Sequence, residues 1–279
     1  MERISLVAKR VRNAAAFCKF QKFSTPTTMQ VTMSDIRLGP EHLERRISAR
    51  FGDQINSGKR SGAYRQLIEE TETGYPYKHG RKFRVKSFYL GYLYHQLARL
   101  TEDVDKKRRF LECALTHYQN FIQRKGNDEE QFFACLSAGI LLQALDQPWP
   151  EAEEIFLAAY ELYPQRGEPI DQIIQHYLSI QQWPIAFLFS SSAKDQFYGK
   201  LPDQGNWGID KSFYNWRVLH LHTAACFSLG RMQEATETFC FLHSLTLRHL
   251  EIFLREEIDL IWSQKNLFPE FEIYATNSA

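Results

Sequence analysis

The chain of 279 residues lacks several features that would assign a function directly. It contains no Gly-rich phosphate loop and no G-x-S-x-G motif, so neither a P-loop enzyme nor an α/β-hydrolase is indicated. Its five cysteines are scattered without a C-x-x-C pair, which argues against a disulfide framework or a zinc ribbon and favours a reducing compartment. No apolar run reaches the roughly 18 residues that can cross a bilayer. We therefore predict no cofactor, no catalytic residue and no transmembrane segment.

Strong charge of one sign is also lacking, because the formal net charge is only +1. Nucleic-acid-binding domains usually carry a basic excess, so nucleic acid is not an expected partner. The first 34 residues are an exception, with six basic side chains and one acidic side chain. We predict that residues 1–38 form a basic, poorly ordered leader. Its role stays open between an organelle-targeting segment, a membrane-surface helix and an upstream extension.

The sequence does contain a helical repeat pattern. Ala152, Phe156, Ala159 and Pro164 have the spacing of the second helix of a tetratricopeptide unit. In such a unit the alanines let two helices approach closely, the aromatic side chain fills the space between them, and the proline ends the helix. This pattern predicts that the chain folds into stacked helical hairpins.

Three other segments fit the same frame. The anchor alanines Ala114, Ala152, Ala186 and Ala235 are 38, 34 and 49 residues apart, and the first two spacings are close to the repeat period of about 34 residues. The third spacing leaves room for an insertion at 196–210. We predict an all-α, tetratricopeptide-like solenoid over residues 39–271, followed by a tail at 272–279. Its hairpins are expected near 85–125, 128–163, 169–195 and 212–247.

Two segments, 148–190 and 210–235, resemble the helical-repeat tail that follows the catalytic domain of certain bacterial and viral family 2 glycosyltransferases. The matching residues are Pro164, Arg166, Glu168 and Pro169, then Ala186, Phe187, Leu188 and Phe189, then Asp210, Tyr214, Trp216 and Arg217. The resemblance covers roughly residues 85–245. It implies a helical scaffold associated with glycan synthesis.

We expect the chain to depart from that family by lacking its catalytic α/β domain, because too few residues precede the resembling segments in this sequence. Asp103-Val104-Asp105 forms a D-x-D, the pattern by which those enzymes hold a metal and a sugar nucleotide. Here it lies between two predicted helices, where an aspartate commonly caps the second helix. We therefore expect Asp103 to be a helix cap, and transferase activity in this chain alone is not expected.

Seven residues are candidates for a binding surface. Arginine forks, carboxylates and aromatic rings that line a groove could bind a peptide, a sugar or an anionic head group. The alternative is structural: Arg166 and Glu168 would join successive hairpins by ion pairs, and Trp216 would pack in the core. The candidates are Arg166, Glu168, Trp207, Asp210, Tyr214, Trp216 and Arg217.

The histidines and cysteines do not predict a metal site. His220 and His222 are two residues apart on an expected helix, so their side chains point in nearly opposite directions and cannot hold one ion together. Four of the cysteines lie in apolar helical segments, where a cysteine is most often a small buried hydrophobe.

These observations together favour a non-catalytic protein-interaction scaffold with a concave groove. Its partner is expected to be a protein or peptide, with a glycan as a further possibility. The expected location is cytoplasmic, or mitochondrial if the source is eukaryotic. The alternative is a small-molecule or glycan-binding enzyme with an all-helical active site that spacing does not reveal.

Overall fold

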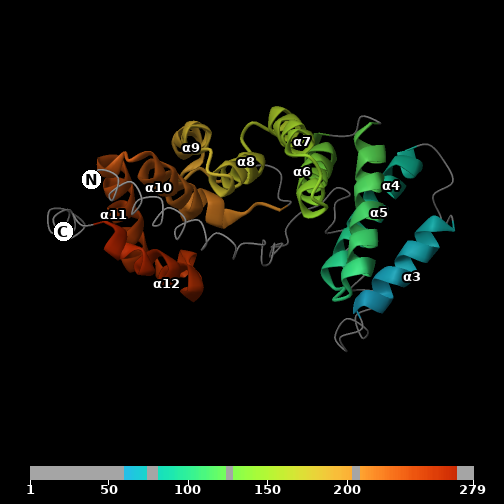
Figure 1. Cartoon of the computed structure of the whole chain (residues 1–279). Coiled ribbons are helices and arrows are strands. Elements are labelled where there is room, and N and C mark those ends of the chain that lie inside the picture. The colour runs from blue at the N-terminus through green and yellow to red at the C-terminus, as the bar shows by residue number, and fades with distance from the viewer. Residues whose placement is uncertain (1–59, 74–80, 124–127, 203–207, 269–279) are drawn as a thin grey trace. The chain divides into compact units, whose positions relative to one another are not determined.

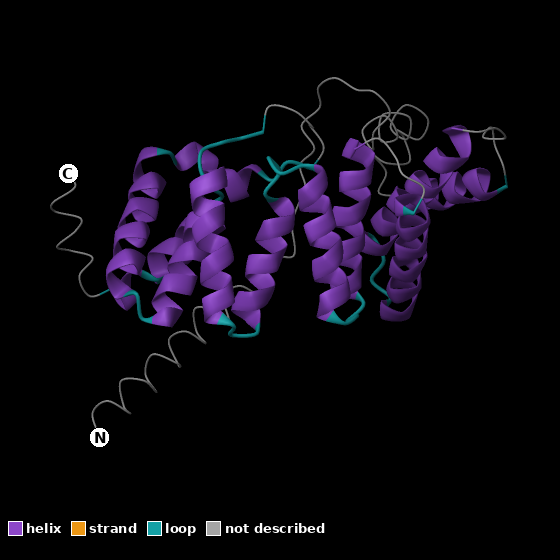
Figure 2. Ribbon diagram, turned by 90° about the horizontal axis from the view of Figure 1, so that it is seen from above, coloured by secondary structure: helices purple, strands orange, loops and turns teal. Residues whose placement is uncertain are grey.

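The computed structural model describes residues 60–73, 81–123, 128–202 and 208–268, with the side chains of 81–85 and Asp128 excepted. Every element in these ranges is a helix, as the all-α prediction requires (Figure 2). The predicted leader at 1–38, the tail at 272–279 and Trp207 lie outside the described residues. None of the described helices is both long and apolar enough to cross a bilayer.

The helices divide into two compact units. The sequence analysis, by contrast, describes residues 39–271 as one helical domain. The division falls in the first turn of α8, between Pro169 and Ile170. We call the described parts the α3–α7 unit and the α8–α12 unit, and each is described by itself.

In the α3–α7 unit, each helix packs against the next one along the chain (Figure 1). Its connections between α4 and α5 and between α6 and α7 are short, so consecutive helices run antiparallel as hairpins. The helices are α3 (Arg60–Glu72), α4 (Arg81–Arg99), α5 (Val104–Ile122), α6 (Asp128–Ala144) and α7 (Trp149–Leu162).

Two glycines let aromatic rings lie against the neighbouring helix in this unit. A Cβ atom on Gly91 would lie 2.9 Å from the ring of Tyr118, and a Cβ on Gly139 would lie 2.5 Å from the ring of Phe156. Real Cβ atoms do not approach a neighbour so closely, so any larger residue would push the ring away. The close helix contacts within α4–α5 and α6–α7 therefore depend on these glycines.

The rest of the core in this unit combines aromatic rings with leucine and alanine side chains. The ring of Phe88 on α4 contacts Tyr118, Phe121 and Phe133, at centroid distances of 6.2, 5.2 and 5.8 Å. Tyr118 and Phe121 are fully buried, as the periodicity predicts. The anchor residues of the tetratricopeptide pattern, Ala152, Phe156 and Ala159, are fully buried as well.

The α8–α12 unit is centred on α10, which packs against both α9 and α11. Every residue from Val218 to Phe227 is buried, as expected of a helix that is covered on all sides. Gly230 ends α10 in the left-handed conformation, at φ 78°. The unit contains α8 (Glu168–Ser179), α9 (Trp183–Phe197), the π-helical turn η2 (Phe213–Arg217), α10 (Val218–Leu229), α11 (Met232–Arg248), η3 (Leu250–Ile252), α12 (Arg255–Ser263) and η4 (Lys265–Leu267).

The described helices show two local departures from the sequence analysis. The expected insertion at 196–210 begins inside α9, since Gln196 and Phe197 are helical and Phe197 is only 2% exposed. The second concerns the cysteines. Cys226 is buried as expected, and Cys240 is half-buried. Cys113, on α5 of the other unit, is exposed, because it lies on the face of α5 opposite Tyr118 and Phe121.

Candidate functional site

Arg166 and Glu168, two of the seven predicted binding residues, pair with each other. Arg166 donates from Nε to Glu168 Oε2 at 2.9 Å and from Nη2 to Oε1 at 3.1 Å. The two side chains are only 1% and 6% exposed, and the guanidinium lies 4.6 Å above the ring of Phe132. A two-pronged buried pair of this kind fixes the turn between α7 and α8 and presents little surface to a ligand.

Arg217 and Asp210, two further candidates, are also brought together, with Asp171 of α8 as a third member. Arg217 Nη2 lies 2.6 Å from both Asp171 Oδ2 and Asp210 Oδ2. Burial raises the pKa of Asp171, whose side chain is 2% exposed, and Arg217 opposes that shift. Burial alone would lower the pKa of Arg217, but the two carboxylates outweigh it and raise the pKa above its usual value. We call these three residues the Arg217 cluster.

The two aromatic candidates within the described residues, Tyr214 and Trp216, lie in the core. Tyr214 is fully buried against Phe197 and Phe213, and Trp216 is 3% exposed and packs against Phe253. The burial of Trp216 agrees with the structural alternative. Tyr214 and Arg217 are three residues apart, a spacing that would place them on one face of a regular helix. The π-helical turn has more residues per turn than an α-helix, so this rule does not apply here.

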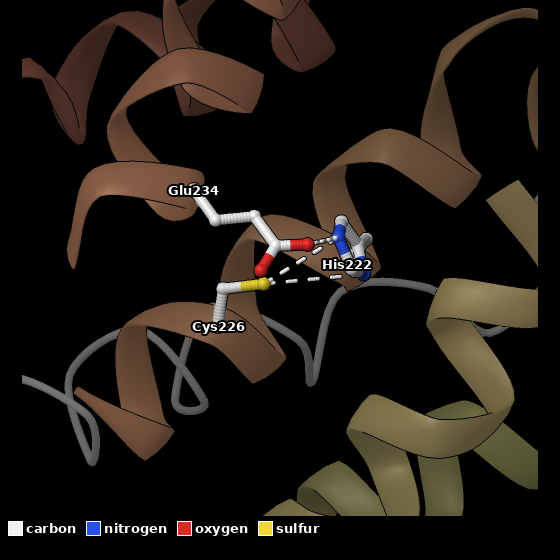
Figure 3. A group of neighbouring side chains, drawn as sticks. All are labelled: His222, Cys226 and Glu234. Carbon is white, nitrogen blue, oxygen red and sulfur yellow. Dashed lines mark hydrogen bonds and ion pairs between the residues drawn. The ribbon is translucent and has the colours of Figure 1, made fainter. Parts of the chain in front are cut away.

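A second polar cluster lies between α10 and α11 and was not predicted (Figure 3). His222 and Cys226 are one turn apart on α10, and Glu234 projects from the first turn of α11 toward them. His222 Nε2 lies 3.0 Å from Glu234 Oε1 and 3.4 Å from Cys226 Sγ. His222 is fully buried, whereas the side chain of Glu234 is 29% exposed. We call these three residues the His222 cluster.

Cationic and polar side chains surround the His222 cluster. Ser190 Oγ lies 3.2 Å from His222 Nδ1, and Lys194 Nζ lies 3.2 Å from Nε2. Arg231 Nε donates to Glu234 Oε2 at 2.8 Å. Each of the three residues of the cluster therefore has a partner that fixes its orientation.

The pKa values of this cluster are shifted in opposite directions. Burial, and then Lys194, lowers the pKa of His222, while Glu234 raises it. Burial and the nearby carboxylate of Glu234 raise the pKa of Cys226 to about 12. At neutral pH the thiol is therefore protonated, and it is not an activated nucleophile.

The sequence contained a partial signal for this cluster. The spacing of His222 and Cys226 is i, i+4, which places both on one helix face, and Glu234 follows the Gly230 turn. The sequence analysis weighed only the pair of His220 and His222. In the structure His220 Nε2 lies 3.2 Å from Gln264 Oε1, so the two histidines have different partners.

The D-x-D motif has the structural role predicted for it. Asp103 is the N-cap of α5, and its Oδ1 accepts a hydrogen bond from the backbone N–H of Lys106 at 3.0 Å. Among the described residues, Asp103 and Asp105 are not part of a group that could hold a metal ion.

Large apolar side chains are exposed on α11, η3, α12 and the residues between them, at the C-terminal end of the α8–α12 unit. Trp262 of α12 lies beside α11, since its Nε1 donates to Thr246 Oγ1 at 3.0 Å and its ring lies 4.8 Å from that of His243. We call Leu247, Leu250, Leu254 and Trp262 the C-terminal apolar surface. Their exposed fractions are 59%, 61%, 62% and 47%.

A comparison with protein-family models finds none that matches this chain, and no curated protein matches it significantly.

Proposed function

We propose that this chain is a protein-interaction scaffold that binds its partner through the C-terminal apolar surface. The observation that carries the proposal is the exposure of Leu247, Leu250, Leu254 and Trp262 on neighbouring segments of one unit. Contiguous exposed apolar side chains mark sites of association, whereas single exposed ones are ordinary. A tryptophan among them fits this reading, because tryptophan is enriched at the centres of protein interfaces.

The scaffold itself is proposed to be a tetratricopeptide-like solenoid. Its support is the order of hairpins and the burial of the small anchor residues Ala114, Ala152, Ala186 and Ala235, each fully buried. The glycine–aromatic contacts of Gly91 and Gly139 give the close helix approach that such a repeat needs.

Binding is assigned to the apolar surface rather than to the residues singled out in the sequence. Arg166 and Glu168 are buried against each other, and Tyr214 and Trp216 are buried in the core. Arg217 and Asp210 are engaged with Asp171. A partner that reached these groups would have to break existing ion pairs, whereas the apolar surface gains from being covered.

The test is affinity purification that compares the tagged parent chain with a double variant, in which Leu250→Asp and Leu254→Asp are combined. Leu254 is the N-cap residue of α12, where aspartate is favoured, so the fold should tolerate the change. The matched control combines Val104→Asp and Leu188→Asp, which alter exposed apolar residues elsewhere, 78% and 69% exposed.

A stoichiometric protein partner that is retained by the control, lost with the surface variant and reconstituted from purified components supports the proposal. A partner that binds both variants equally overturns the assignment of the surface. Absence of any partner favours the small-molecule or glycan-binding enzyme instead.

The partner class is proposed from the resemblance of residues 148–190 and 210–235 to glycosyltransferase tails. If that resemblance reflects common descent, a component of glycan synthesis is the expected partner. Identification of the captured protein tests this part separately, because any other protein leaves the apolar surface supported and removes the glycan connection.

A further inference from the structure

The His222 cluster brings three different metal-ligating atoms to one point. The atoms are an imidazole nitrogen, a thiol sulfur and a carboxylate oxygen, and all three lie within 4.8 Å of one another. They come from two helices that pack directly against each other, α10 and α11. Figure 3 shows the three side chains pointing toward a common centre.

The separations fit a tetrahedral site. Zinc bonds of 2.0–2.3 Å at tetrahedral angles place nitrogen about 3.3 Å from oxygen and about 3.6 Å from sulfur. The observed distances from His222 Nε2 are 3.0 Å to Glu234 Oε1 and 3.4 Å to Cys226 Sγ. Cys226 Sγ also lies 4.0 Å from His222 Nδ1, so the sulfur lies beside the imidazole ring and not along the Nε2 lone pair. Binding of an ion therefore requires the side chain of Cys226 or His222 to rotate so that the sulfur and the lone pair meet at one point.

The groups behind the three ligand atoms are those that metal sites use to orient ligands. Ser190 Oγ donates to the carbonyl of Phe187 at 3.2 Å, so its lone pair can accept the Nδ1–H of His222 and leave the Nε2 lone pair for a metal. Arg231 holds Oε2 of Glu234 and leaves Oε1 toward the centre. The ring of Phe187 stacks on the imidazole, with centroids 5.6 Å apart.

Lys194 supplies a positive charge beside the ligand atoms in the absence of a metal. Its ammonium lies 3.2 Å from His222 Nε2 and 4.0 Å from Glu234 Oε1, so a positive charge already lies beside two of the three ligand atoms. The side chain of Lys194 is 27% exposed, and its long stem can carry the ammonium into solvent when another cation enters.

We propose that His222, Cys226 and Glu234 form a binding site for a divalent transition metal, with zinc the best fit, and that Lys194 competes with the ion for the same position. The nitrogen, sulfur and oxygen ligands select zinc over calcium or magnesium, which require all-oxygen sites. When the ion binds, the Cys226 thiol loses its proton to the solvent and the sulfur binds as thiolate. Three protein ligands leave a fourth position for water.

The experiment is titration of the purified full chain with Co²⁺ alone and Zn²⁺ alone under reducing conditions. A cobalt–thiolate charge-transfer band at one equivalent is the expected signature, and Zn²⁺ should displace it. Cys226→Ser should remove the band, whereas Cys240→Ser, on the same pair of helices, should keep it. We expect His222→Gln to weaken Zn²⁺ binding by more than about 100-fold, beyond the effect of outer-shell changes.

Lys194→Met gives the sharper test, because it removes the competing charge and keeps the length of the side chain. We expect Zn²⁺ to bind this variant about tenfold more tightly or better, while Lys211→Met, an exposed lysine of the same unit, should change nothing. Lys194 is partly exposed, so this variant should fold even if His222→Gln does not. Cobalt binding without a thiolate band, the same band in Cys226→Ser, or weaker binding by Lys194→Met would each overturn the proposal.

Discussion

The α3–α7 unit and the α8–α12 unit are built from the same kind of helix, yet they bury different kinds of side chain. The α3–α7 unit relies on aromatic rings that lie against glycines and alanines, as at Gly139 and Phe156. The α8–α12 unit buries titratable groups, among them Asp171, His220 and His222. The α3–α7 unit also buries the ion pair of Arg166 and Glu168, so the difference is one of degree: the first unit depends more on close glycine–aromatic contacts and the second more on polar clusters. Changes of side-chain shape and changes of charge should therefore have different effects in the two units.

The largest expected effect is in the α3–α7 unit. Ala159→Glu places a carboxylate in a fully buried helix contact, and we expect a loss of about 4 kcal/mol or more in the free energy of unfolding. Leu157→Glu is the matched control, since Leu157 is on the same helix and 37% exposed. Urea denaturation should show about 1 kcal/mol or less for the control. Equal losses of stability in the two variants would contradict the prediction that Ala159 lies on the buried face of α7.

The corresponding change in the α8–α12 unit is Arg217→Leu. It leaves Asp171 buried without its cation, and we expect a loss of about 3–5 kcal/mol. Hydrogen exchange followed by mass spectrometry should place the lost protection in α8 and α10. Arg248→Leu, at an exposed arginine of α11, serves as the control. A neutral result for Arg217→Leu would mean that the cluster is not important for stability.

A smaller effect is expected in the α3–α7 unit from a substitution that changes the size of a side chain and not its charge. Gly139→Ala forces a methyl group into the ring of Phe156, and we expect a loss of about 1–3 kcal/mol. Gly62→Ala should instead stabilise by about 0.5–1 kcal/mol, because a Cβ at that helical position meets nothing within 4 Å. Phe156→Leu should relieve part of the cost of Gly139→Ala in a double-mutant cycle. Additive effects of these two changes would argue against the close approach.

The smallest expected effect is a pH dependence in the α3–α7 unit. Burial, with the like charge of Arg99, lowers the pKa of His95 from 6.5 to about 4. The unfolded chain then binds more protons between these values, so stability should fall as the pH decreases through that window. We expect His95 to contribute about 1–2 kcal/mol between pH 7 and pH 5. His95→Gln should remove that contribution and leave the one from His220, whose pKa is also lowered to about 4 by burial. If stability depends on pH in His95→Gln as it does in the parent chain, the pH dependence comes from other groups.

The helices were predictable because their signals are local. The buried faces of α5 and α7 follow from periodicity, and the N-cap at Asp103 follows from its place between two helical patterns. The apolar residues at helical spacing and the turn residues lie within one hairpin, so no knowledge of the rest of the chain is needed.

The polar clusters were less accessible because some of the contacts that hold their members in place join residues far apart in sequence. Asp171 is 46 residues from Arg217, and Ser190 is 32 residues from His222. Periodicity shows which face of a helix is buried, but it does not show which buried polar group meets which partner. Arg166 and Glu168 were expected, in the structural alternative, to join successive hairpins by ion pairs, and in the structure they pair with each other across two residues.

The π-helical turn at Phe213–Arg217 has a consequence for how this protein can evolve. A π-turn holds about one residue more than an α-helical turn, so it corresponds to a single inserted codon. Deleting that codon would give a regular helix, but it would rotate everything before it by about 100° relative to α10. Tyr214 would then leave its contact with Phe197, while Arg217 and His222 stayed in place. Within this segment, natural selection should therefore act more strongly against the deletion of one residue than against most substitutions.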